Sequence, residues 1–200
     1  GITGGDVTDG NANVWILNLA SQSWTAVSNI SNQSLTAGQG FLIYAFDDID
    51  FDGDSDLPVD LYVSGTHNTG NISISSIPQN SYYLAGNPYI KTIDWDDVSK
   101  TNLSSVVSVW DDATTDWKTW NGSSGDLTNG LIAPFQGFWI QASGGIGSFT
   151  IQANDISTIT GSFLGRTINQ ELDGSLVLSF SANDYEEKII IIHIETVSYT

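Results

Sequence analysis

The sequence contains no cysteine and no methionine, and only five of its 200 residues are lysine or arginine. Without cysteine there is no disulfide, no thiolate nucleophile and no cysteine-based zinc site. With 23 acidic residues and a formal net charge of −18, the chain has little with which to neutralise phosphate groups. We therefore expect no nucleic-acid partner and no attraction to an anionic membrane surface.

Long hydrophobic runs and a nucleophile signature are missing as well. No stretch of about 18 apolar residues is present, so we expect no membrane insertion, and Gly1 does not begin a signal peptide. The pattern G-x-S-x-G is absent, and the chain has only two histidines. We interpret His193, inside an apolar run, as structural and His67 as a solvated loop residue. The sequence thus predicts a protein that is not an enzyme.

The residues that are abundant indicate a secreted protein. Hydrophobic residues make up 40% of the chain, which is enough to form a core. Serine, threonine, asparagine, glycine and aspartate are frequent while lysine and glutamate are few, a composition typical of exposed, long-lived β proteins. We expect an extracellular location at a cell surface.

An aspartate-rich stretch between residues 46 and 60 predicts a calcium site. Carboxylates this close repel one another unless a hard cation neutralises them, and Ca²⁺ takes its oxygen ligands from such loops. The spacing D-x-D-x-D-G resembles the calcium loops of EF-hands, thrombospondin repeats and integrin-type propellers, with Gly53 supplying the sharp turn. We predict that Ca²⁺ is bound by Asp48, Asp50, Asp52, Asp54 and Asp56.

This stretch is not expected to be an EF-hand. The strand-like sequence FLIYAF precedes it where a helix would be needed, and Val59 stands where an EF-hand has its bidentate glutamate. The alternative to a calcium site is a solvated acidic turn.

The aspartate-rich stretch lies inside an internal repeat. Residues 37–45, AGQGFLIYA, recur as residues 133–142, APFQGFWIQA, and Val14-Trp15 recurs as Val109-Trp110. Such self-similarity indicates two copies of one structural module. The first copy lacks a counterpart of YYLAGNPY at 82–89, so we expect the chain to belong to a longer polypeptide whose neighbouring modules are its partners.

Short apolar segments separated by Gly, Asn and Asp turns predict an all-β fold. We expect two related sandwich-like modules in tandem, followed by the first strands of a further β unit. The apolar segments at 176–180 and 188–195 are the strands expected to open that unit. The predicted domains are residues 1–80, 81–155 and 156–200.

Four segments together carry a resemblance to a known family. The sequences YYLAGNPYIKTIDWDD, SVVSVWDD, APFQGFWIQA and GQGFLIYAF are similar to a repeated β module of large secreted Bacteroidota proteins. In that group the module usually precedes a C-terminal sorting domain for type IX secretion. The resemblance covers about residues 35–155 and implies an exported, surface-bound or released protein. Its expected partners are polysaccharide or the secretion and cell-surface machinery, and the resemblance carries no catalytic residues to transfer.

Acidic residues near turns are the candidates for sugar hydrolysis. A glycosidase needs two carboxylates facing each other, about 5–5.5 Å apart for retention or 6.5–9.5 Å for inversion. No pair is distinguished by the sequence, so we interpret all of them as solvated turn residues: Asp94, Asp96, Asp97, Asp111, Asp112 and Asp116.

The seven tryptophans divide into two groups by their surroundings. Three lie in apolar strands and are expected in the core: Trp15, Trp110 and Trp139. Three are flanked by acids and threonine and are the candidates for stacking on a ligand: Trp95, Trp117 and Trp120. The spacing of Trp117 and Trp120 places them on opposite faces of a strand.

The function that the sequence predicts is a structural or adhesive module of a secreted, cell-surface protein, stabilised by calcium. The alternative is a carbohydrate-binding module attached to a secreted enzyme, which would use one exposed tryptophan.

Overall fold

The computed structural model has an all-β fold, as the sequence predicts. No α-helix occurs in the described part of the chain, which holds two short 3-10 turns, η3 (Thr128–Gly130) and η4 (Ala153–Asp155). The structure describes the backbone alone for residues 59–64, 176–182 and 185–189. The full description covers residues 12, 14–27, 36–43, 53, 68–111 and 113–164.

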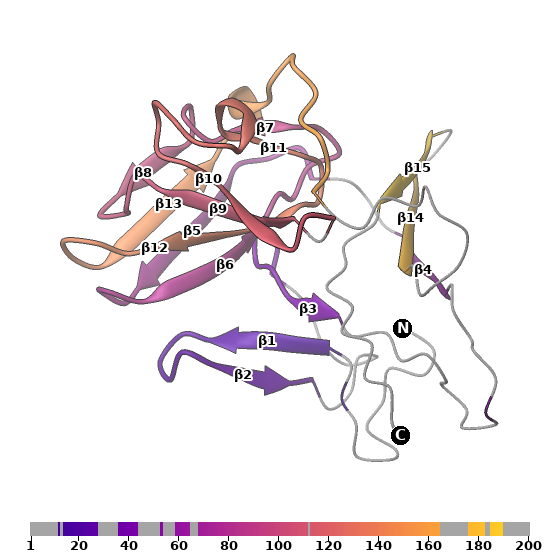
Figure 1. Cartoon of the computed structure of the whole chain (residues 1–200), viewed down its shortest axis with the longest axis horizontal. Coiled ribbons are helices and arrows are strands. Elements are labelled where there is room, and N and C mark those ends of the chain that lie inside the picture. The colour runs from indigo at the N-terminus through magenta and orange to yellow at the C-terminus, as the bar shows by residue number, and fades with distance from the viewer. Residues whose placement is uncertain are drawn as a thin grey trace.

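Two antiparallel sheets face each other between residues 68 and 164 (Figure 1). The larger sheet has the order β10-β9-β12-β6, and its strands are Asp116–Trp120, Val107–Asp111, Gly137–Gln141 and Tyr82–Gly86, respectively. The smaller sheet has the order β5-β13-β8, and its strands are Ile72–Ile77, Gly147–Ile151 and Ser99–Thr101. A third, two-stranded sheet joins β7 (Ile93–Asp94) to β11 (Leu131–Ile132).

The core forms between these sheets because alternate side chains of a strand point to opposite faces. Along β9 and β12, every second residue is buried. The rings of Tyr83 on β6 and Phe149 on β13 meet edge to face, with centroids 6.0 Å apart. The side chains buried with them include Ile74, Ile77, Val107, Val109, Phe138, Ile140 and Ile151.

An N-terminal hairpin repeats part of the larger sheet. Its strands are β1 (Val14–Asn18) and β2 (Ser23–Ala26), and β1 also pairs with β3 (Leu42–Ile43). The order β2-β1-β3 is the same as the order β10-β9-β12 of the segments that match it in sequence. The register differs by two residues between the copies. Trp15 pairs with Leu42, and their counterparts in the repeat are Trp110 and Trp139. Trp139, however, pairs with Ser108, two residues before Trp110.

Strand β6 connects the two repeats. On one edge it pairs with β12, so that Gly137 lies opposite Gly86. On its other edge, Gly40 N donates to Leu84 O at 3.0 Å and Gly86 N donates to Gly38 O at 3.1 Å. The Gln-Gly segments of both copies therefore flank the same strand. A side chain at Gly40 would not fit, since its Cβ would lie 2.7 Å from Ala85 O.

A strand that precedes the predicted domain boundary at residue 80 pairs with one that follows it. Strand β5, which falls within the predicted first module, pairs with β13 of the second, from Ile72 opposite Ile151 to Ile77 opposite Gly147. The apolar residues of β5 are buried in the core of the second unit. The second unit thus begins about ten residues earlier than the sequence repeat indicates.

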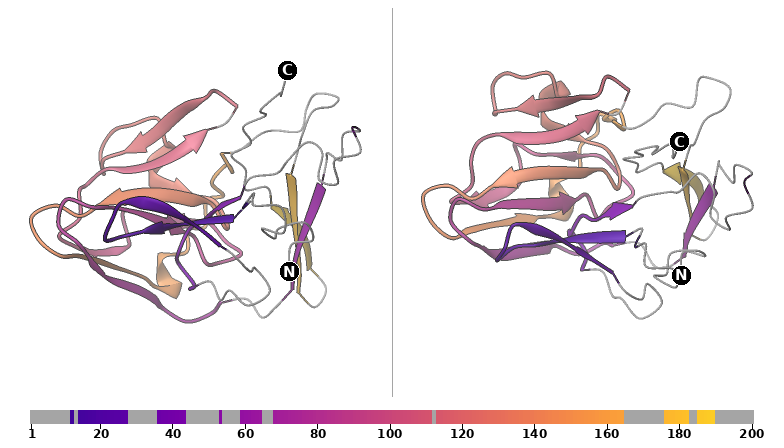
Figure 2. Two further views of the ribbon diagram at one scale, coloured as in Figure 1. Left: turned by 90° about the horizontal axis from the view of Figure 1, so that it is seen from below. Right: turned by 60° about the horizontal axis from the view of Figure 1, so that its bottom comes forward.

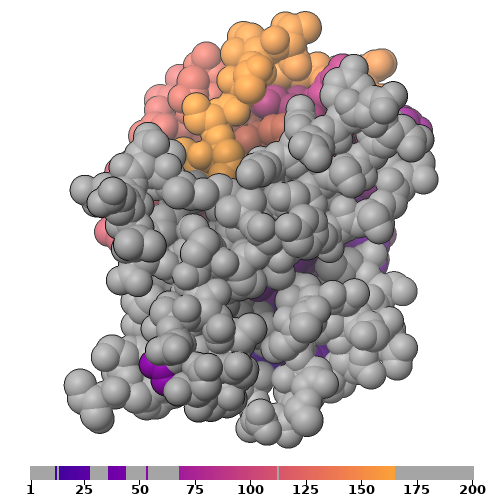
Figure 3. Space-filling model, turned by 90° about the vertical axis from the view of Figure 1, so that its right-hand side faces the viewer, coloured from indigo at the N-terminus to yellow at the C-terminus, as the bar shows by residue number. Residues whose placement is uncertain are grey.

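Residues just after the predicted boundary at residue 155 contact the residues before it. Ile156 forms a β-bridge with Ile93, Ser157 N donates to Thr92 O at 2.9 Å, and Gly161 N donates to Thr92 Oγ1 at 2.9 Å. Leu164 packs against the core. The segment 156–164 therefore belongs to the second unit, on the surface seen at the top of Figure 3.

The predicted third unit is not built from its own strands alone. Strands β14 (Leu176–Ala182) and β15 (Tyr185–Ile189) form the expected antiparallel pair, but β14 also pairs in parallel with β4 (Val59–Ser64). This three-stranded sheet lies beside the main body in Figures 1 and 2. Strand β4 lies in the sequence of the predicted first module, so this pairing joins it to residues of the predicted third unit.

Candidate functional site

The Gly-Asn-Pro-Tyr sequence has a structural role. Asn87 is 2% exposed, and its Nδ2 donates to Lys91 O at 2.8 Å, Ile132 O at 3.1 Å and Ala133 O at 2.9 Å. Its Oδ1 accepts from Tyr89 N at 3.0 Å. One amide side chain thus holds the turn after β6 to the strand β11, in a place where water is excluded.

Two further residues of the signature segments tie the strands together. The buried Tyr89 donates through its hydroxyl to Gly70 O at 2.7 Å and to Ile151 O at 3.2 Å. The buried Gln136 accepts from Leu164 N at 2.8 Å, which fixes the end of the second unit. The side-chain polar atoms of Asn87, Tyr89 and Gln136 are therefore engaged within the protein rather than presented to a ligand.

Trp95 is not exposed, so its selection as a ligand-binding residue is wrong. It is 1% exposed, and its ring meets Phe138 at 5.3 Å and Phe149 at 5.9 Å, both edge to face. Lys100 Nζ lies 4.8 Å from the centroid of the Trp95 ring and donates to its backbone oxygen. The acids beside Trp95 in sequence point away from the core while its indole enters it.

Trp117 and Trp120 lie on opposite faces of β10, as predicted. Trp120 packs against the core, and its Nε1 donates to both carboxylate oxygens of Asp96, each at 3.0 Å. Trp117 is 43% exposed. Of the three candidate residues, only Trp117 offers an open ring to a ligand.

Two of the tryptophans expected in the core, Trp110 and Trp139, lie instead on the other side of the larger sheet. Trp110 and Trp139 are half-buried, because Val109 and Ile140 next to them take the inward positions. Trp110 meets Trp117 edge to face at 5.1 Å, and Trp139 meets Trp24 of the N-terminal hairpin at 5.8 Å. Trp15 is half-buried as well.

We call this side of the larger sheet the outer face. The pairing registers assign to it the residues that alternate with the buried ones. They are Trp117, Thr119, Ser108, Trp110, Gly137, Trp139, Gln141, Tyr82, Leu84 and Gly86. None of them is charged. This face is not among the features predicted from the sequence, although the alternation of Val107 with Val109 and of Phe138 with Ile140 carries the signal for it.

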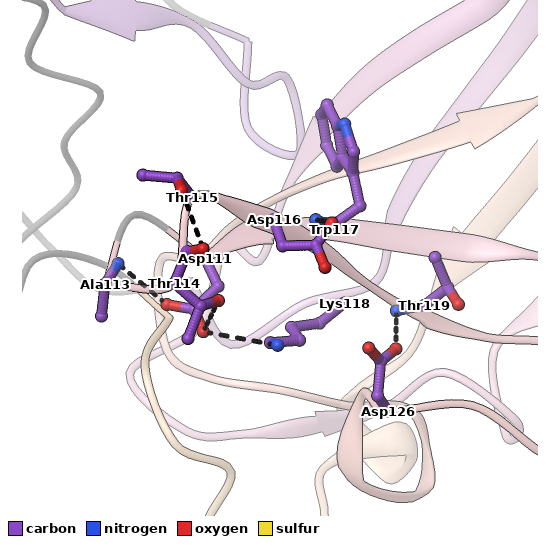
Figure 4. A network of polar contacts seen from close by, with 9 residues as sticks. All are labelled: Asp111, Ala113, Thr114, Thr115, Asp116, Trp117, Lys118, Thr119 and Asp126. Atoms are coloured by element: carbon purple, nitrogen blue, oxygen red, sulfur yellow. Dashed lines mark hydrogen bonds and ion pairs between the residues drawn. The ribbon is translucent and has the colours of Figure 1, made fainter.

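The charged residues of β9 and β10 lie on the inner side of the sheet, at the hairpin turn (Figure 4). Asp111 accepts from Ala113 N at 3.1 Å and from Thr114 Oγ1 at 2.8 Å, and its carboxylate is 3.9 Å from Lys118 Nζ. In Figure 4 the indole of Trp117 points away from Lys118, toward the opposite side of the ribbon. The network closes the turn and leaves the outer face uncharged.

Two of the remaining candidate acids accept hydrogen bonds from nearby backbone. Asp94 accepts from Asp96 N at 3.0 Å, and Asp116 accepts from the backbone nitrogen of Trp117 at 2.8 Å. Burial raises the pKa of Asp94, and burial lowers the pKa of Lys100 nearby. The hydrogen bond from Thr119 N lowers the pKa of the exposed Asp126.

Tyr83 provides a pH-dependent test of the core. Burial raises its pKa from 10.0 to about 12. Because the folded pKa exceeds the unfolded one, the contribution to stability is complete below about pH 10 and is lost as the pH rises to about 12. As the pH rises through this range, we expect the unmodified protein to lose roughly 2–3 kcal/mol of unfolding free energy that Tyr83→Phe does not lose. Urea unfolding at a series of pH values measures the difference. A loss of stability between about pH 10 and about pH 12 that is as large in Tyr83→Phe as in the unmodified protein would contradict the burial of Tyr83.

The predicted calcium ligands Asp48, Asp50, Asp52, Asp54 and Asp56 lie outside the described residues, as do His67, Asp112 and His193. Within the loop the structure describes Gly53, whose φ of +94° is in the region that favours glycine. Among the described residues, no group of three or more His, Asp or Glu side chains is placed to hold a metal ion.

In comparisons with protein-family models, curated proteins and solved structures, nothing matches this chain. No helix in the described part is long and apolar enough to span a membrane.

Proposed function

We propose that this chain is a non-catalytic structural or adhesive module of a secreted, cell-surface protein. The observation that carries the proposal is that residues of the segments that resemble the Bacteroidota module have structural roles. Asn87, Tyr89 and Gln136 hydrogen-bond to neighbouring segments of the chain, and Trp95 fills the core. Asp94 and Asp111 accept hydrogen bonds from turn backbone. A module whose distinctive side chains are engaged in this way is suited to displaying surfaces rather than to catalysis. Export through type IX secretion belongs to the same proposal and rests on the sequence resemblance.

The tandem arrangement is part of this proposal. We infer two related sandwich-like modules followed by the first strands of a further unit. The common order of β2-β1-β3 and β10-β9-β12 supports the repeat. Because β6 pairs with the Gln-Gly segments of both copies, the two would act as one mechanical unit, with neighbouring modules of a longer polypeptide as partners.

Calcium is proposed to stabilise the loop of residues 48–56. The φ of Gly53 supports a tight turn at the centre of this loop, and its carboxylates are of the kind that Ca²⁺ prefers. The aspartates would supply the ligand oxygens, and the ion would neutralise their mutual repulsion.

The calcium proposal predicts a stabilisation that depends on the loop. We expect the melting temperature in millimolar calcium to exceed that in chelator, because the ion binds the folded loop preferentially. Asp52→Ala should lower the melting temperature in calcium and leave it unchanged in chelator, as measured by calorimetry. Asp126→Ala is a matched exposed carboxylate outside the loop and should reduce stability equally in both buffers. An equal loss for Asp52→Ala in both would contradict the assignment.

Carbohydrate binding is the second candidate function, and the outer face favours it. Trp117 is 43% exposed on a sheet face without charged residues, and exposed aromatic rings with polar neighbours are suited to contact sugar rings.

A further inference from the structure

The outer face differs in charge from the chain as a whole. The protein has 23 acidic residues, yet all outward positions on β6, β9, β10 and β12 are uncharged. The charged residues Asp111, Asp116 and Lys118 of these strands occupy the other side. A surface kept free of charge in a protein of net charge −18 fits a neutral partner.

Three aromatic side chains of this region are exposed and are spread diagonally over the sheet. They are Trp117, Trp24 and Tyr82, with exposed fractions of 43%, 36% and 51%. Trp24 rests on Trp139. From the registers and the usual strand spacing, the backbone of Trp117 lies about 12 Å from that of Trp139, which lies about 8 Å from that of Tyr82. This spread suits an extended ligand of several units rather than a single small molecule.

Two of the rings are oriented by a second indole. Trp110 meets Trp117 at an interplanar angle of 71°, and Trp139 meets Trp24 at 82°. Such edge-to-face contacts restrict the rotation of the outer ring. A ring that is already oriented loses less entropy when a ligand stacks on it.

Small residues separate the two indole pairs. Ser108 and Gly137 lie between them on β9 and β12, and Gly86 continues the row on β6. A Cβ atom built on Gly137 would have no neighbour closer than 3.9 Å. The backbone is therefore open to a flat ligand here, and the position tolerates a side chain.

We propose that the outer face binds a neutral polysaccharide of equatorially linked hexopyranoses, with Trp117 stacking on one sugar ring and Trp24 and Tyr82 on others. Such sugars have apolar C–H faces for the rings and hydroxyls for Ser108, Thr119 and Gln141. An acidic polysaccharide would be repelled by the net charge. Exposed aromatic side chains without charged neighbours also occur at protein interfaces, so a protein partner is one of the outcomes that the test distinguishes. This inference rests on the second candidate function.

The test uses the full chain in affinity electrophoresis through gels that contain neutral, equatorially linked glucans or mannans, or the acidic polygalacturonate and alginate. We expect retardation by at least one neutral polymer and by neither acidic polymer. Trp117→Ala should weaken this binding roughly tenfold. Gly137→Thr should abolish it without lowering the melting temperature, because the new side chain fits the fold but stands between the indole pairs. Ile159→Ala, which removes an exposed residue outside the face, should bind normally.

Three outcomes would overturn the proposal. The first is that no neutral polymer retards the protein, and the second is that Gly137→Thr keeps full binding. The third is that the protein self-associates in sedimentation and Gly137→Thr abolishes this association, because the face would then be a protein interface. Each gel is run in calcium and in chelator beside a melting curve. If the calcium proposal fails, the melting temperatures in calcium and in chelator will be equal. This result is independent of whether a polymer retards the protein, so the two failures can be distinguished.

Discussion

Replacing Trp95 by alanine is expected to lower the free energy of unfolding by about 3–5 kcal/mol. The ring is 1% exposed and fills the space between Phe138 and Phe149, so its removal leaves a cavity that the two sheets cannot close by themselves. A typical domain has only about 5–15 kcal/mol of stability, so a large part of the total would be lost. Urea unfolding followed by circular dichroism measures the difference.

The same substitution at Trp117 is the control. Trp117 is 43% exposed and loses only its edge contact with Trp110, so we expect a cost of about 1 kcal/mol. If the two variants were equally destabilised, the assignment of Trp95 to the core and of Trp117 to the surface would be refuted.

Asn87→Ala is expected to cost about 3 kcal/mol or more. The substitution leaves Lys91 O, Ile132 O, Ala133 O and Tyr89 N without the hydrogen bonds of the Asn87 side chain. Unsatisfied buried polar groups cost about 1–3 kcal/mol each, and rearrangement of the turn recovers part of the total. The unfolding midpoint in urea measures the loss.

Asn121→Ala provides a matched comparison. Asn121 also accepts from backbone nitrogens, those of Ser123 at 3.0 Å and Ser124 at 2.9 Å, but in an exposed turn where water can replace it. We expect a loss below about 1 kcal/mol. A loss at Asn87 no larger than that at Asn121 would show that its bonds do not hold the β6 turn to β11.

The division of the tryptophans shows where reasoning from local sequence fails. Trp110 and Trp139 were expected inside because apolar residues surround them, but a strand has two faces, and the valines, isoleucine and phenylalanine beside them take the inner one. Trp95 was expected outside because acids flank it. It follows the short strand β7, where the chain turns, and there the neighbours in sequence do not share its environment.

The outer face is partly readable from the sequence. The alternation in VSVWD and GFWIQ predicts which residues share a face. Which of the two faces is covered depends on β13 and β5, which come from outside these segments and pack on one side only. The exposure of Trp117 and the contact of Trp24 with Trp139 therefore could not be read from local patterns.

The sequence by itself determined the all-β class, the repeated hairpin and the opposite orientation of Trp117 and Trp120, because these depend on turn residues and on the two-residue period of a strand. Only the tertiary structure decided the unit boundaries, the burial of Trp95 and the composition of the outer face. The reason is that β5 pairs with β13, β6 with both repeats and β14 with β4 across long separations in sequence. Such pairings are selected by burial of the whole set of strands and not by any one of them.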